Sequence, residues 1–68
     1  MNANKVMKLE KLSIDKAIER MTYGIDQSNL LIAIESVDDL SVISMHTSSN
    51  KLRMRCLKAI EAFGAHTF

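Results

Sequence analysis

The segment at residues 30–47 constrains the fold of this chain more than any other. Two runs rich in Leu, Ile and Val, at 30–36 and 40–47, flank the pair Asp38-Asp39. Short runs of this kind around residues that suit turns are typical of an antiparallel β-hairpin. The pair contains no Gly, which makes a strict two-residue type I′ turn less certain. The sequence therefore predicts strands at 30–36 and 40–47.

The alternation of side chains sets the register of this hairpin. If Val37 faces Leu40, one face gathers large apolar side chains, namely Leu30, Ile32, Ile34, Ile43 and Met45. A slip of one residue would mix polar and apolar side chains on both faces, and burial of one face disfavours it. The opposite face still carries Leu31, Ala33 and Val42, and two strands leave two open edges. We therefore expect Leu31, Ala33 and Val42 to meet another chain.

A helix is predicted on each side of the hairpin. Ser13 is a suitable N-cap for a helix at 13–23, and Gly24 suits a left-handed C-cap. Its apolar arc consists of Ile14, Ala17, Ile18 and Met21. An earlier start would bring Glu10 into this arc, so residues 1–12 are expected to be an extended or irregular lead-in. The last helix is predicted at 50–63, capped within Ser48-Ser49-Asn50 and ending before Gly64. Its core stripe consists of Leu52, Cys56, Ala59, Ile60 and Phe63.

The order α-β-β-α predicts a single α+β domain over residues 1–68. In its simplest two-layer packing, both helices cover one face of the hairpin. A chain of 68 residues buries only ~60% of the surface that its unfolded form exposes. The single Cys56 excludes an internal disulfide, and Cys56, His46 and His66 are too few and too widely spaced for a zinc site. We therefore expect no metal or cofactor, and we expect the fold to be completed by homo-oligomerisation.

The chain carries no sign of a membrane segment. Its longest unbroken apolar run, residues 30–34, has five residues, whereas a bilayer helix needs ~20. The residues after Met1 contain no apolar stretch of the kind found in a signal peptide. The sequence therefore predicts a cytoplasmic protein with no membrane partner.

Few residues offer catalytic chemistry. Cys56 and His46 are the one conceivable pair of nucleophile and base, but a Cys in a core stripe is far more often a small buried apolar residue. Asp38 and Asp39 are paired carboxylates that suit a solvated turn equally well. No phosphate-binding loop or nucleotide motif is present. The sequence therefore indicates a protein that is not an enzyme.

The last helix carries two features away from its core stripe. Met54 and Leu57 lie off the stripe, and we expect them to contact another chain. The helix also carries a basic strip that suits nucleic acid or another anion, formed by Lys51, Arg53, Arg55 and Lys58. The net charge of +1 is low for a dedicated nucleic-acid-binding module, and mixed-charge helix faces are most often simply solvated.

The order of these patterns resembles that of many short phage and prophage proteins. They share a helix, an apolar strand, an acidic turn, a second strand ending in Ser/Thr, and a final helix. Here the pattern occupies residues 13–21, 30–49 and 52–63. The turn of those proteins is usually acidic-Gly and their final helix often contains Trp, whereas this chain has Asp38-Asp39 and no Trp. The resemblance assigns no activity to any residue. It implies an accessory protein that acts on a host component, such as an anti-CRISPR or another inhibitor of a defence system.

Taken together, the sequence predicts a small, non-enzymatic, self-associating interaction protein. It would bind and inhibit or modulate a larger macromolecule, with a protein complex favoured over nucleic acid as the target. One alternative is a nucleic-acid-binding regulator that uses the basic strip. Another is an oligomer that holds a small anionic ligand between subunits.

Overall fold

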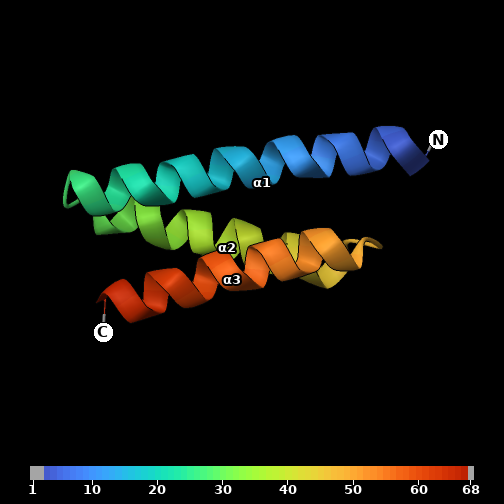
Figure 1. The fold of residues 1–68 in the computed structure, drawn as a ribbon. Coiled ribbons are helices and arrows are strands. Elements are labelled where there is room, and N and C mark those ends of the chain that lie inside the picture. Colours follow the sequence, from blue (N-terminus) through green and yellow to red (C-terminus); the bar gives the residue numbers. More distant parts are fainter. Residues whose placement is uncertain (1–2, 68) are drawn as a thin grey trace.

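Residues 3–67, which the computed structural model describes, form three helices joined by two short connections (Figure 1). The helices are α1 (Ala3–Asp26), α2 (Leu30–His46) and α3 (Asn50–Thr67). Connections of this length make neighbouring helices antiparallel, so α1 and α3 run in the same direction and α2 runs in the opposite one. The bundle is elongated, with principal extents of 39 × 17 × 13 Å.

The prediction of an α+β fold with a hairpin is wrong. No strand occurs in residues 3–67, and the two predicted strands form the single continuous helix α2. Asp38 and Asp39 lie in the middle of this helix, not in a turn. The buried residues of α2 recur every three or four positions, which is the period of a helix: Ala33, Ser36, Leu40 and Ser44.

The buried side of α2 is made largely of small and hydroxyl-bearing residues. The Ser36 hydroxyl donates a hydrogen bond to the Ile32 carbonyl oxygen at 2.8 Å, and the Ser44 hydroxyl donates to that of Ser41 at 2.7 Å. These bonds within the helix satisfy hydroxyl groups that would otherwise be costly to bury. Because small side chains point inward, most of the large apolar side chains of α2 are left at the surface.

The helix α1 begins ten residues before the predicted N-cap Ser13, at Ala3. Residues 3–12 therefore belong to α1 and not to an irregular lead-in, while residues 1–2 lie outside the described part. Glu10 does fall on the packed side of the helix, as the helical wheel indicated. It is half-buried there, and its Oε1 accepts a hydrogen bond from the Thr47 hydroxyl at 3.2 Å. This partner from the connection after α2 makes a carboxylate tolerable inside the apolar arc.

Gly24 lies inside α1 and not at its cap. It is buried, and a Cβ added to it would lie 2.8 Å from the Ala33 nitrogen and 2.8 Å from the Asn29 oxygen. Gly24 therefore permits the close crossing of α1 and α2.

The left-handed cap residue of α1 is Ser28, with a φ of 57°. The Ser28 N–H donates to the Ile25 oxygen at 3.2 Å, and the Asn29 N–H donates to the Gly24 oxygen at 2.6 Å. These two bonds form a Schellman motif, which satisfies carbonyl groups at the end of the helix.

The helix α3 begins as predicted and ends later than predicted. The Ser49 hydroxyl accepts a hydrogen bond from the Leu52 N–H at 3.3 Å, so Ser49 is the N-cap. The helix continues through Gly64 to Thr67. The core prediction for this helix is confirmed, since Leu52 and Cys56 are buried and the rest of the stripe is half-buried against them. The predicted apolar arc of α1 is confirmed in the same way.

Candidate functional site

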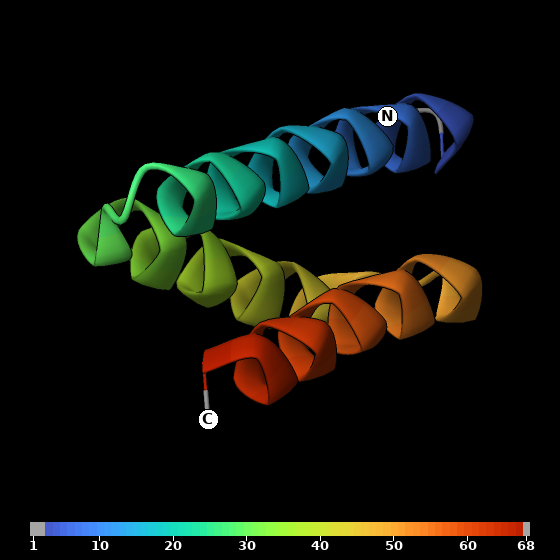
Figure 2. The ribbon, with the colours of Figure 1, turned by 60° about the vertical axis from the view of Figure 1, so that its left-hand side comes forward.

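A groove runs between the N-terminal halves of α1 and α3. It has a volume of about 730 Å³. Its lining comes from both helices and from the connection before α3: Asn4, Met7, Lys8, Lys11, Ser49, Lys51, Leu52, Met54, Arg55 and Lys58. The helix α2 packs against both α1 and α3, which contact each other much less (Figure 2). The groove therefore stays open on the side away from α2.

The rims of this groove are basic. They carry Lys8 and Lys11 on α1 and Lys51, Arg55 and Lys58 on α3. Spacings of three, four and seven residues place each set on one side of its helix. Arg55 forms an ion pair with Asp15 of α1, in which the side chains are 41% and 45% exposed. This is the one ion pair found in residues 3–67, so the four lysines remain without a carboxylate partner there.

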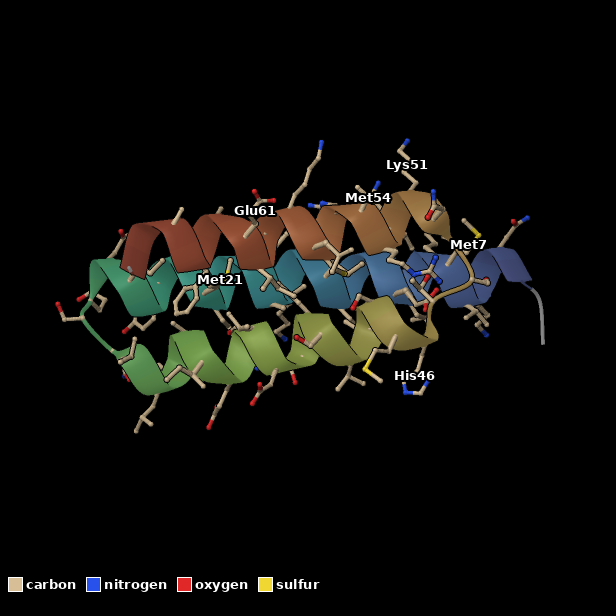
Figure 3. All side chains as sticks on the ribbon, turned by 90° about the horizontal axis from the view of Figure 1, so that it is seen from below. Met7, Met21, His46, Lys51, Met54 and Glu61 are labelled. Carbon is tan, nitrogen blue, oxygen red and sulfur yellow. The ribbon has the colours of Figure 1, made fainter. Side chains whose placement is uncertain are left out.

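Apolar side chains also contribute to this lining. Met7 and Met54 are 40% and 46% exposed, and Leu52 is buried. Lys51 and Met54 project from the edge of the bundle formed by α3, with Met7 of α1 beside them (Figure 3). Unbranched, polarizable methionine side chains adapt readily to the shape of a contacting surface. The groove thus combines apolar and cationic side chains, which suits a ligand that is both apolar and anionic.

The outward side of α2 presents a second surface, which we call the outer stripe. It consists of Leu31, Ile34, Asp38, Val42 and Met45, at spacings of three and four residues. Leu31 and Met45 are 74% and 77% exposed, values unusual for large apolar side chains. Two more exposed acidic residues, Glu35 and Asp39, are close to the stripe, and residues 30–46 contain no Lys or Arg. The outer stripe is therefore apolar with acidic charge at its centre.

The structure separates the residues predicted to meet another chain. Leu31 and Val42 lie together on the outer stripe, and Met54 lies in the groove. Leu57 is exposed on α3 outside the groove lining. Ala33 is fully buried at the crossing of α1 and α2, which gives it no exposed surface.

The predicted basic strip is divided in a similar way. Lys51, Arg55 and Lys58 line the groove, whereas Arg53 points toward the end of α2. Its guanidinium donates to the Ser44 carbonyl oxygen at 3.0 Å and to that of Thr47 at 2.7 Å. The last carbonyls of a helix lack partners within the helix and carry partial negative charge. Arg53 therefore caps α2 and joins it to α3.

The structure does not bring Cys56 and His46 together as a catalytic pair. Cys56 is fully buried in α3, and its burial raises the pKa of the thiol, an effect that the nearby Arg55 partly offsets. His46 is exposed at the end of α2 and points away from the bundle (Figure 3). The described residues contain no group of three His, Cys, Asp or Glu side chains that would hold a metal ion.

A second concave surface lies between α1 and α2. It has a volume of about 550 Å³ and is lined by Lys16, Glu19, Arg20, Tyr23, Ile32, Glu35, Ser36 and Asp39. Its charges have both signs, so it does not select for an anion or a cation. The groove between α1 and α3 is the stronger candidate because its charged side chains are all basic.

Comparison with known protein families, characterised proteins and solved structures gives no match. None of the three helices in residues 3–67 combines the length and apolar character needed to cross a membrane. Sequence reasoning missed Met7, Lys8 and Lys11, which complete the groove from α1. Lys8 and Lys11 recur at helical spacing with Asn4, and that period was the available signal.

Proposed function

We propose that this protein is a non-enzymatic binding module that holds an acidic amphipathic helix of a partner protein in the groove between α1 and α3. The observation that supports this most strongly is the combination of two half-exposed methionines with five basic side chains in the lining of one groove. Helix-in-groove recognition uses such a surface, with apolar anchors on the floor and charges at the edge.

The dimensions of the groove agree with this mode of binding. Its lining extends from Asn4 to Lys11 on α1 and from Lys51 to Lys58 on α3. Each of these segments covers eight residues, which corresponds to about 10 Å, or two turns. The groove therefore accepts two apolar residues of a partner helix, three or four positions apart, with acidic residues beside them.

Fluorescence anisotropy with a designed peptide tests this proposal. The probe is a labelled helical peptide that has Leu at spacings of three and four residues and Glu at the flanking positions. The matched control peptide has Lys in place of Glu. We expect the acidic peptide to bind, the basic peptide not to bind, and affinity to fall as salt rises, because the attraction is between exposed charges.

Two matched variants locate the binding surface. Lys51→Glu reverses a charge on the rim of the groove, and Lys5→Glu makes the same change on α1 outside its lining. Lys51→Glu is expected to weaken binding of the acidic peptide about tenfold. Lys5→Glu is expected to leave the affinity near that of the unaltered protein. Equal binding of both peptides, or equal losses in both variants, would contradict the proposal.

Nucleic acid binding is the second candidate function. The observation that favours it is the addition of Lys8 and Lys11 to the basic residues of α3 around one groove. Against it stand the apolar side chains of the lining and the acidic outer stripe of α2. A labelled DNA or RNA oligonucleotide would then bind with an affinity that falls steeply with salt, and Lys51→Glu would reduce the salt slope.

The phage-type inhibitor role remains a prediction from the sequence. Its resemblance depended on two strands, and residues 3–67 form helices only. Such an inhibitor would therefore bind its target through the groove or the outer stripe, not through a hairpin face.

A further inference from the structure

The outer stripe of α2 has the properties that the groove selects for. It is a helix face with large exposed apolar side chains, and Asp38 lies at its centre. Residues 30–46 contain three acidic residues and no Lys or Arg, whereas the groove carries five basic side chains. The two surfaces are therefore complementary in both polarity and charge.

We propose that the outer stripe of one copy of this chain docks in the groove of a second copy. This inference depends on the proposed function, since it uses the same groove and names the helix that occupies it. The part of the stripe from Leu31 to Asp38 covers eight residues, about 10 Å, which matches the two-turn length of the groove. In the complex, Leu31 and Ile34, three positions apart, contact Met7 and Met54, and Glu35 and Asp38 meet the basic side chains.

Charge disfavours the simpler pairing of two outer stripes. In an antiparallel pair centred on Asp38, this carboxylate would face its own copy. Like charges placed opposite one another destabilise an interface. Lys16 and Arg20 of α1 share a concave surface with Glu35 and Asp39, but Asp38 is not part of that lining. The groove of another copy supplies cations for Asp38.

The two surfaces of one copy face in opposite directions. In Figure 3, Lys51 and Met54 lie along one edge of the bundle, and α2 with His46 lies along the other. An interface between different surfaces on opposite sides does not close after two copies. Head-to-tail docking therefore continues beyond two copies, into a ring or an open chain, with each copy contributing α2 to the groove of the next.

Sedimentation velocity over a range of protein concentrations and salt tests this inference. The unaltered chain is expected to form a series of oligomers of the 7.6 kDa unit that grows with concentration and shrinks as salt rises. Asp38→Lys on the stripe and Lys51→Glu in the groove are each expected to weaken association about tenfold. The controls Asp26→Lys and Lys5→Glu make the same charge changes at exposed positions outside both surfaces. They are expected to associate as the unaltered chain does, and circular dichroism checks that every variant is helical.

Mixing the two weakened variants gives the decisive result. In a mixture of Asp38→Lys and Lys51→Glu, the introduced Lys faces the introduced Glu, and the remaining stripe and groove are unaltered. The mixture is therefore expected to assemble at lower concentrations than either variant alone. An association that survives Lys51→Glu would indicate a stripe-to-stripe dimer and overturn the inference. A monomeric chain that still binds the acidic peptide would overturn the inference while leaving the proposed function intact.

Discussion

The two glycines of the chain allow one substitution to be tested in two packing environments. Replacing Gly by Ala in an open helix position stabilises the helix by about 1 kcal/mol. Gly64 lies inside α3, and nothing lies within 4 Å of the Cβ that Ala would add. Gly64→Ala is therefore expected to raise the free energy of unfolding by up to about 1 kcal/mol.

Gly24→Ala is expected to do the opposite. The added Cβ would lie 2.8 Å from two backbone atoms of α2 and its preceding connection, and 2.9 Å from the Ala33 Cβ. Backbone atoms cannot move aside without shifting the crossing of α1 and α2, and overpacking of this kind costs about 1–3 kcal/mol. With three such contacts we take the upper part of this range. After the gain in helix propensity, the net loss is about 1–2 kcal/mol.

Urea and thermal unfolding followed by circular dichroism measure both variants. The two are expected to differ by about 2–3 kcal/mol, which for a chain of this size corresponds to a difference of about 10 °C or more in Tm. In a background that carries Ala33→Gly, one of the three contacts is absent, so Gly24→Ala is expected to cost less there than in the unaltered chain. If Gly24→Ala proved as stable as Gly64→Ala, the close crossing of α1 and α2 would be refuted.

Three further substitutions test other parts of the bundle. Ser28→Gly is expected to stabilise the protein by about 1 kcal/mol in urea unfolding, because Gly adopts the left-handed cap conformation without strain. Arg53→Met is expected to cost about 1–2 kcal/mol in the same assay, because two carbonyls at the end of α2 lose their donor. Burial raises the pKa of Cys56, so the folded thiol still holds its proton where the unfolded one ionises. The free energy of unfolding should therefore fall as pH rises above about 8.5, and Cys56→Ala should remove that part of the pH dependence.

The helix α2 shows why the sequence predicted the wrong fold class. Leu30, Ile32 and Ile34 alternate as in a strand, and this pattern of large side chains led to the hairpin. The helix is instead packed through small and hydroxyl-bearing residues, which carry almost no hydrophobic signal. The spacing of seven residues between Ala33, Leu40 and Thr47, all buried, is the signal that was available.

The flanking helices were easier to predict because their large apolar residues do point inward. The arc that begins at Ile14 and the stripe that begins at Leu52 are both in the core. The start of α1 was missed because a charged residue in an apolar arc normally ends a helix pattern, and only the tertiary contact from Thr47 satisfies Glu10. Because this start was missed, the α1 side of the groove was not predicted to be helical. The α3 side was correctly predicted to lie on a helix.

The small residues on the buried side of α2 also bear on how the protein responds to temperature. The heat capacity change on unfolding rises with the apolar area that becomes exposed, and polar groups lower it. A bundle whose interior includes Ser36, Ser44 and Thr47 exposes less apolar area on unfolding than one with a wholly apolar interior, so its heat capacity change should fall below the usual ~12–15 cal/mol/K per residue. The curve of its free energy of unfolding against temperature should then be shallow, and the loss of stability on cooling should be slight. Covering the outer stripe would bury Leu31 and Met45 and make that curve steeper.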